Sequence, residues 1–402
     1  MSLDLTSLSR QVRQMSTTVA ADANLTDQRI AEVRSRYLRA TGEEAGWTAV
    51  IDASRETAAW LFARPVEPFD TVCDLPPCPR DYTLVATDGS QIDLDRHGSV
   101  ACYLLNIGRV FLRYGTTSLA RLSSHPTLYY REEDLYLSDG ARRVAIEGNY
   151  LSTRRDVEEG VALADLADEF LDGSEPSIAL QDGTLVRWTL AGAEKFVQDH
   201  FLARYLAYLE RMRVRDIPVA SYISRPRAPE LIGTVRLMLC PDVRIEEKRG
   251  AICSECSDVR ADRTPSCQIC QGLVDADIMA DGLAEGQRGP LFVSMSRINI
   301  ESYGPHLIHF FYLRVGREVA RVEVPRWVAT DAAHVDRVHT LVYDQCARGQ
   351  GYPVALARAH EQAVVRSADR RTFLSMLEGS LIRAEAPANA SRKRESKEFT
   401  RG

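Results

Sequence analysis

The fold is decided by two stretches, YTLVATDGSQ (residues 82–91) and SIALQDGTL (residues 177–185). In each, a short apolar run of strand length leads into an Asp-Gly pair, Asp88-Gly89 and Asp182-Gly183. Such runs are typical of buried strands, and the glycine after each favours a turn. The sequence therefore predicts two core strands that each deliver an aspartate at the carboxyl end, where α/β sheets bind ligands.

Each Asp-Gly pair by itself is a common turn sequence, but its repetition after two strands of one domain favours a chemical role. Between the strands, apolar spacing predicts a helix over residues 151–171. Glu159 lies one turn before Leu163, beside the face expected to pack on the sheet, and Glu158 is the alternative. A purely solvent-exposed role for these acids stays open. Metal-assisted phosphodiester hydrolysis needs such a small group of carboxylates around divalent cations.

The remaining pattern predicts an α/β domain with a mixed sheet flanked by helices. Strands are expected at 100–107 and 109–114, joined by a turn at Gly108, and at 218–223, 291–295, 306–315 and 318–324. Helices are expected within 1–65 and at 194–213, 336–346, 353–365 and 371–383. These elements predict an N-terminal helical region with a proline-rich linker (1–75), a main domain (76–385), an insertion within it (240–290) and a disordered tail (386–402).

Two CxxC pairs, Cys253–Cys256 and Cys267–Cys270, lie in the expected insertion and are separated by ten residues. This spacing is typical of a tetrahedral structural Zn²⁺ site, whose four thiolates leave no position for a substrate water. A disulfide or an iron–sulfur cluster is the alternative. The sequence predicts a zinc-ribbon-like module.

The C-terminal stretch GYPVALARAH (351–360) predicts a helix that begins near Pro353. Leu356, His360 and Val364 then share one face. His360 is either a core histidine or, beside a metal site, a ligand or proton relay. Tyr352 either anchors the turn or contacts a phosphate or a base of the substrate.

Four pieces together resemble the NurA family of DNA end-processing nucleases: TDGSQ (87–91), RRDVEE (154–159), QDGTL (181–185) and GYPVALARAH (351–360). The order strand–Asp, helix–Glu, strand–Asp is similar to the ribonuclease H-like fold. The resemblance implies Asp88, Glu159 and Asp182 as ligands of catalytic Mn²⁺ or Mg²⁺, and active-site roles for Tyr352 and His360.

For the whole protein, the resemblance implies an exonuclease, with some single-strand endonuclease action, in DNA end processing and double-strand break repair. It also implies a homodimer that works with a HerA-type ATPase. The chain has no Walker-type GxxxxGK[ST] motif, so ATP-driven translocation would come from another chain. The alternative function is a non-catalytic nucleic-acid or partner-binding protein that uses the zinc module on a decayed nuclease fold. The presence of all three acids and His360 speaks against decay.

Composition and charge restrict the classes of protein to which the chain can belong. No stretch approaches the ~18 apolar residues of a membrane span, and the N-terminus has no apolar signal region, so a cytoplasmic protein with no membrane partner is expected. The net charge of −6 argues against a chain coated in positive potential, although a carboxylate active site is itself acidic. Four arginine clusters are candidate phosphate contacts or ordinary surface charges: Arg142–Arg143, Arg154–Arg155, Arg211/Arg213/Arg215 and Arg225/Arg227.

Overall fold

The computed structural model describes residues 4–93 and 100–384, apart from the side chains of 20–24, so the tail expected to be disordered lies outside the described residues. The chain divides into two compact units, described here one at a time. Unit 1 comprises Met1–Asp74, Ser224–Ser296 and His309–Arg321. Unit 2 comprises Leu75–Ile223, Arg297–Ile308 and Val322–Gly402.

Unit 2 contains a mixed sheet with the strand order β8-β7-β2-β3-β4. Neighbouring strands β2, β3 and β4 are antiparallel, whereas β7 pairs in parallel with β2 and with β8. The expected α/β architecture, a mixed sheet flanked by helices, is confirmed. The strands are β2 (Tyr82–Ile92), β3 (Tyr103–Tyr114), β4 (Leu119–Tyr129), β7 (Ser177–Asp182) and β8 (Val219–Ile223).

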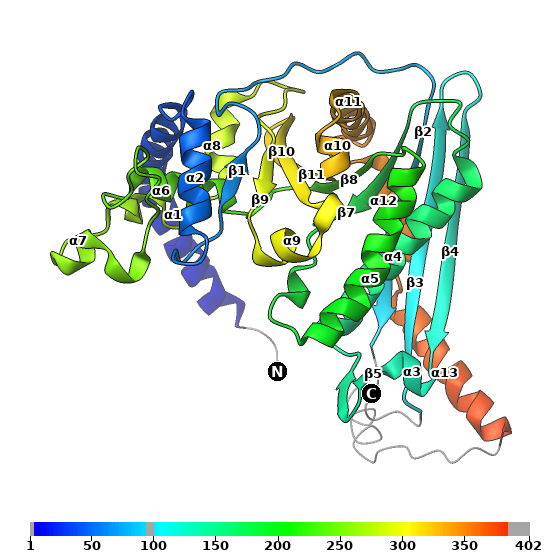
Figure 1. Cartoon of the computed structure of the whole chain (residues 1–402). Coiled ribbons are helices and arrows are strands. Elements are labelled where there is room, and N and C mark those ends of the chain that lie inside the picture. Colours follow the sequence, from blue (N-terminus) through cyan, green and yellow to red (C-terminus); the bar gives the residue numbers. More distant parts are fainter. Residues whose placement is uncertain (1–3, 94–99, 385–402) are drawn as a thin grey trace. The chain divides into compact units, whose positions relative to one another are not determined.

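Helices cover this sheet on both faces. α4 (Asn149–Phe170) and α5 (Lys195–Val214) run side by side (Figure 1) and enclose the main apolar core with Val85. α12 (Val354–Ala363) contacts β2, β3 and β4. Alternate residues of a strand point to opposite faces, so Val85 and Thr87 face α4 while Asp88 and Ser90 face α12.

Two glycines expected in turns lie inside strands instead. β2 does not end at Asp88-Gly89 but continues to Ile92, because β3 still pairs with it there, with Gly89 opposite Ile107. The strands expected at 100–107 and 109–114 are the single strand β3, with Gly108 in its middle. A Cβ at Gly108 would lie 2.1 Å from the carbonyl oxygen of Ala359, so glycine permits α12 to lie against the sheet.

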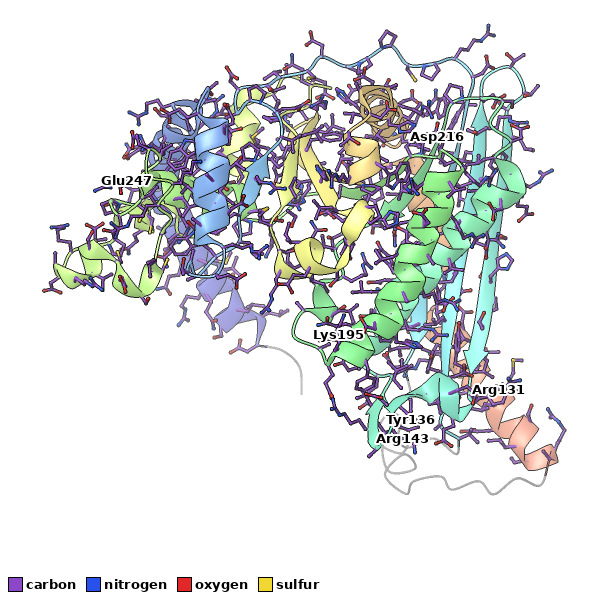
Figure 2. All side chains as sticks on the ribbon, in the orientation of Figure 1. Arg131, Tyr136, Arg143, Lys195, Asp216 and Glu247 are labelled. Atoms are coloured by element: carbon purple, nitrogen blue, oxygen red, sulfur yellow. The ribbon has the colours of Figure 1, made fainter. Side chains whose placement is uncertain are left out.

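Strand β4 is an edge strand that the sequence pattern does not predict. Its residues lie outside the core, so no alternation of apolar and polar residues marks it, and it contains Pro126, which only an edge strand tolerates readily. The hairpin of β5 (Tyr136–Asp139) and β6 (Arg142–Ala145) follows, where the Arg143 guanidinium lies 3.7 Å from the centre of the Tyr136 ring (Figure 2).

Unit 1 consists of helices around a short antiparallel sheet of order β1-β9-β10. The buried Asp275 carboxylate caps the start of α6 (Glu230–Leu239), because it accepts hydrogen bonds from the backbone N–H of Leu231 (3.0 Å) and Ile232 (2.8 Å). It also accepts a hydrogen bond from the Tyr312 hydroxyl at 2.7 Å. The elements are α1 (Leu5–Leu38), α2 (Glu44–Ser54), β1 (Ala63–Pro65), α6 (Glu230–Leu239), α8 (Asp275–Met279), β9 (Phe292–Ser294) and β10 (Ile308–Val315).

The expected helices at the C-terminus are confirmed. Strand β11 (Glu318–Pro325) begins in unit 1 and ends in unit 2. The remaining helices are α3 (Glu132–Leu135), α7 (Ser257–Arg260), α9 (Arg297–Ser302), α10 (Arg326–Ala329), α11 (Ala332–Arg348) and α13 (Ser367–Arg383), with 3₁₀ turns η1 (Trp188–Leu190), η2 (Cys253–Glu255), η3 (Ser266–Cys270), η4 (Ala280–Gly282) and η5 (Gly304–His306).

Candidate active site

Two aspartates lie at the same level on the two central parallel strands of unit 2. The register of β2 and β7 pairs Thr87 with Gln181, so the residues that follow, Asp88 and Asp182, are neighbours across the sheet. β7 ends at Asp182, where Gly183 turns the chain with a φ of +74°. The parallel pair therefore delivers two carboxylates to one position.

Each aspartate bonds to a side chain from the α12 region. The Tyr352 hydroxyl donates to Oδ1 of Asp182 at 2.8 Å. Nδ1 of His360 lies 2.7 Å from Oδ2 of Asp88, at hydrogen-bond distance. The His360 side chain is 69% exposed, which rules out the core-histidine interpretation of its apolar stripe.

Backbone contacts hold α12 in this place. The Asn106 side-chain amide donates to the carbonyl oxygens of Gln362 (3.1 Å) and Ala363 (2.8 Å), and the Ser90 hydroxyl also donates to Ala363. With Gly108 leaving room for the helix backbone, these bonds fix the segment that carries His360 beside Asp88.

Glu159 approaches from α4, on the other face of β2. The Thr87 hydroxyl donates to the Glu159 carbonyl oxygen at 3.0 Å and ties this turn of the helix to the strand. The Glu159 side chain is buried, and a Cβ at Gly89 would lie 2.5 Å from its Oε1. Gly89 therefore permits the close approach of Glu159, which is a different role from the turn that the sequence predicts.

Glu158, the alternative third carboxylate, is engaged elsewhere. It lies 2.9 Å from Nε of Arg154 and 2.7 Å from a terminal nitrogen of Arg204 on α5. Glu159 interacts electrostatically with Asp88.

Burial and the charge of Asp88 both disfavour the ionised forms of Glu159 and Asp182. Burial raises the pKa of Glu159 well above its usual value, and the charges of Asp156 and Asp88 add to this while Arg155 opposes it. Displacement of water by the surrounding protein raises the pKa of Asp182, as does Asp88, whereas the hydrogen bond from Tyr352 lowers it. Such a group favours a proton or a cation among its members.

The donor chemistry fits a hard divalent cation. Asp88, Asp182 and Glu159 offer the carboxylate oxygens that Mg²⁺ and Mn²⁺ prefer. Within residues 4–93 and 100–384, no group of three or more His, Cys, Asp or Glu side chains is arranged so that it could hold a metal ion. The three carboxylates fit a cation by the chemistry of their oxygens, and Asp88 interacts electrostatically with both of the others.

A chain of ion pairs beside Glu159 was not predicted. Arg155 donates from Nε to Oε1 of Glu159 and from a terminal nitrogen to Oδ1 of Asp156, both at 3.2 Å. Arg187, from the segment after β7, donates to Oδ2 of Asp156 at 2.6 Å. The i,i+4 spacing of Arg155 and Glu159 could have indicated the first link, whereas no local signal marks Arg187.

The cysteine segment of unit 1 is made of short helices. Cys253 lies in η2 and Cys256 follows it, and Cys267 and Cys270 lie in η3, so the structure does not show a ribbon of strands here. The four thiols are unpaired, and Cys267 interacts electrostatically with Cys253, Cys256 and Cys270. Burial raises the pKa of the Cys270 thiol to about 11, although the nearby Arg236 opposes this.

Side chains outside the segment anchor it. Arg29 of α1 donates to the carbonyl oxygen of Ile269 at 2.8 and 2.9 Å, and Arg236 of α6 donates to that of Cys270 at 3.3 Å. Asp258 accepts from the backbone N–H (2.9 Å) and hydroxyl (2.8 Å) of Ser266, which joins the stretches that carry the two CxxC pairs.

Most arginines of the expected basic patches form ion pairs. Arg142 lies 3.0 Å from Glu194 and Arg143 lies 3.1 Å from Glu132. The other pairs are Arg211 with Asp165 and Asp168, Arg213 with Glu210, Arg215 with Asp168, and Arg225 with Glu318. These patches are therefore largely neutralised.

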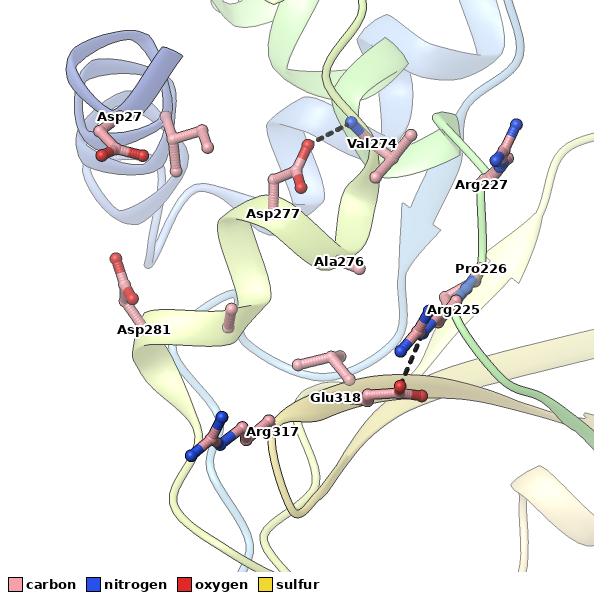
Figure 3. A pocket seen from close by; sticks show the side chains of 13 residues that line it. Asp27, Arg225, Pro226, Arg227, Val274, Ala276, Asp277, Asp281, Arg317 and Glu318 are labelled. Atoms are coloured by element: carbon pink, nitrogen blue, oxygen red, sulfur yellow. Dashed lines mark hydrogen bonds and ion pairs between the residues drawn. The ribbon is translucent and has the colours of Figure 1, made fainter. Parts of the chain in front are cut away.

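An open cavity of about 710 Å³ lies in unit 1 and is lined by none of the predicted metal-binding or catalytic residues (Figure 3). Its charged lining has both signs: Arg225, Arg227 and Arg317 against Asp27, Asp277, Asp281 and Glu318. Arg225 and Glu318 lie 2.6 Å apart, and Asp277 accepts a hydrogen bond from the backbone of Val274 at 2.8 Å. The cavity has no single-sign surface that selects phosphate.

Fold and site together define an α/β protein with an acidic site on two adjacent parallel strands, at the end of β7 and within β2, completed by a tyrosine and a histidine. The NurA domain model matches residues 82–365, which include all five of these side chains. The chain belongs to the NurA family, a nuclease family in DNA end processing. No curated protein gives a significant match. No helix in the described part of the chain is long and apolar enough to cross a membrane.

Proposed function

We propose that this NurA-family protein is a divalent-metal-dependent deoxyribonuclease, an exonuclease with some single-strand endonuclease action, in DNA end processing and double-strand break repair. The observation that carries the proposal is the position of Asp88 and Asp182 on adjacent parallel strands, with Glu159 brought in across Gly89. The strand order β8-β7-β2-β3-β4, with an acid on β2, α4 and β7, supports the ribonuclease H-like form of the fold.

In this proposal, Asp88, Glu159 and Asp182 hold Mn²⁺ or Mg²⁺. A bound divalent cation supplies water activation and charge neutralisation at the scissile phosphate. The Tyr352 hydroxyl orients Asp182 through its hydrogen bond, and His360 orients Asp88 through Nδ1. The exposed His360 ring then has Nε2 for exchanging a proton with an oxygen of the substrate.

The test is cleavage of end-labelled linear duplex and single-stranded DNA with Mn²⁺, Mg²⁺ or EDTA. The cleavage rate should fall by about 100-fold or more in each of Asp88→Asn, Asp182→Asn and Glu159→Gln, because removing a ligand takes away several kcal/mol of transition-state stabilisation. Glu158→Gln is the matched control on the same helix and should keep its activity. EDTA should abolish cleavage.

The alternative is a non-catalytic nucleic-acid or partner-binding protein. Wild-type protein that leaves both substrates intact with either ion, with and without a HerA-type ATPase, would favour it. Equal losses of activity in Glu158→Gln and Glu159→Gln would instead show that Glu159 is wrongly assigned as the third carboxylate.

We also propose structural Zn²⁺ bound by Cys253, Cys256, Cys267 and Cys270. Support comes from the CxxC spacing and from the mutual electrostatic interactions of the thiols. Elemental analysis should find about one zinc per chain, reduced in Cys253→Ser and Cys267→Ser but kept in the control Cys78→Ser, whose side chain is exposed. Equal zinc in all three variants, or iron in its place, would contradict the assignment.

The proposed setting is cytoplasmic, as a homodimer acting with a HerA-type ATPase. α1 exposes an apolar stripe at the alternating spacing of three and four residues that is typical of helix–helix seams, a surface that another subunit can cover. Light scattering and co-purification with the ATPase test these partners. The stripe consists of Leu5, Leu8, Val12, Met15 and Val19.

A further inference from the structure

Four charged side chains of unit 2 form a continuous series that ends at a proposed metal ligand. Arg187 bonds to Asp156 at 2.6 Å, Asp156 to Arg155 at 3.2 Å, and Arg155 to Glu159 at 3.2 Å. Arg155 and Asp156 lie about one turn before Glu159 on α4, whereas Arg187 follows β7 and its Asp182. The series thus connects the elements that deliver two of the carboxylates.

A contribution to fold stability does not by itself explain why Arg187 is buried. The Arg187 side chain is 4% exposed and its guanidinium lies 4.7 Å from the centre of the Tyr205 ring. Its Nε has no hydrogen-bond partner among the described residues. Burying a guanidinium sacrifices hydration, and apolar residues of similar volume often stabilise a fold as well as a buried ion pair does. A role in fixing geometry is the better explanation.

The backbone at Arg187 is a firm point of attachment. The Tyr303 hydroxyl accepts from the Arg187 backbone N–H at 2.7 Å and donates to the Leu185 carbonyl oxygen at 2.9 Å. Arg155, which contacts Glu159, packs its side chain over Gly89, where a Cβ would lie 2.7 Å from Cγ. Both arginines of the series are therefore held by packed neighbours.

We propose that Asp156 and Arg187 are positioning residues that hold Arg155 against Glu159 and so fix the Glu159 carboxylate for the divalent cation. The inference rests on the proposed function. Groups that orient metal ligands from outside typically change metal affinity by about 10–100-fold when mutated. We expect losses of that size in the affinity for Mn²⁺.

Calorimetric titration of Mn²⁺ without DNA separates positioning from simple electrostatics. Asp156→Asn removes a negative charge and Arg187→Met removes a positive one, so electrostatics alone would weaken Mn²⁺ binding in the first and strengthen it in the second. Positioning weakens it in both. Arg187→Lys keeps the charge but loses the planar fork, so it should weaken binding too, by less than Arg187→Met.

Two further variants make the test specific. Arg204→Met removes a partner of Glu158 on the outer side of α4 and should leave the Mn²⁺ affinity unchanged. The double variant Asp156→Asn/Arg187→Met should bind Mn²⁺ about as weakly as the weaker single variant, because both changes break the same series of ion pairs.

A high concentration of Mn²⁺ should restore DNA cleavage in the single variants to within about threefold of wild type.

Thermal unfolding verifies that each variant is folded; if Arg187→Met is not, Asp156→Asn and Arg187→Lys carry the test. Mn²⁺ affinities within twofold of wild type in these two, or tighter binding in Arg187→Met, would overturn the inference and leave the proposed nuclease intact. A wild-type chain with no Mn²⁺ site dependent on Asp88 and Asp182 would overturn both.

Discussion

At the scale of the residue, Gly89 and Glu159 depend on each other. Oε1 of Glu159 lies 2.5 Å, and Cγ of Arg155 2.7 Å, from the position that a Cβ at residue 89 would take. We therefore expect Gly89→Ala to displace the glutamate and lower cleavage by about 100-fold, as a shift of about 1 Å can do. The measurement is kcat at saturating Mn²⁺, with Gly379→Ala on α13 as the control. Full activity in Gly89→Ala would show that Glu159 is not held in this way.

The raised pKa values of Glu159 and Asp182 predict the pH dependence of stability. The folded chain holds these protons more tightly than the unfolded chain, so their stabilising effect is fully present below the ordinary carboxyl pKa and is lost as pH rises through the raised values. In EDTA, the wild-type Tm should therefore fall relative to that of Asp182→Asn as pH increases from about 4. Thermal unfolding across pH, with and without Mn²⁺, measures this; Mn²⁺ should reduce the difference. Parallel Tm curves for the two proteins would contradict the prediction.

At the scale of the element, α12 depends on a single missing side chain. A Cβ at Gly108 would lie 2.1 Å from Ala359 O and 2.6 Å from Ala363 N, and backbone atoms cannot rotate away as side chains do. Gly108→Ala should destabilise the fold by about 1–3 kcal/mol through overpacking. It should also lower cleavage, because α12 carries His360. Denaturant unfolding together with kcat tests both; an unchanged unfolding midpoint would refute the close packing.

The elements also show what the sequence could and could not predict. Helical periodicity predicts α4 and α5 to within a residue or two, because each helix packs on one face. Short apolar runs predict β7 and β8 equally well, because both strands are buried in the sheet. Gly89 and Gly108 were predicted to turn, since a sequence does not distinguish a glycine needed for φ from one needed for close approach. Strand β4 carries no pattern because it is an exposed edge.

The candidate site likewise contains residues that local sequence signals mark and residues that they do not. The neighbouring positions of Asp88 and Asp182 could be predicted because local signals mark both residues, each following an apolar run and preceding a glycine. The sequence left Glu158 and Glu159 as alternatives because their different partners, among them Arg204, come from contacts distant in sequence. Arg187 could not be predicted for the same reason.

At the scale of the whole molecule, charge distinguishes a nuclease from a protein that merely binds DNA. The net charge is −6, and most arginines of the candidate basic patches are paired with acids. A binding protein gains its affinity from free cations that displace counterions, with a salt slope of about −0.9 per phosphate contacted. For wild-type protein in EDTA we expect weak DNA binding with a slope smaller in magnitude than about 4, equivalent to fewer than about five such contacts. Fluorescence anisotropy between 50 and 200 mM salt measures it. A slope of about −6 or steeper would reveal a basic surface that these ion pairs do not suppress, and would favour the non-catalytic alternative.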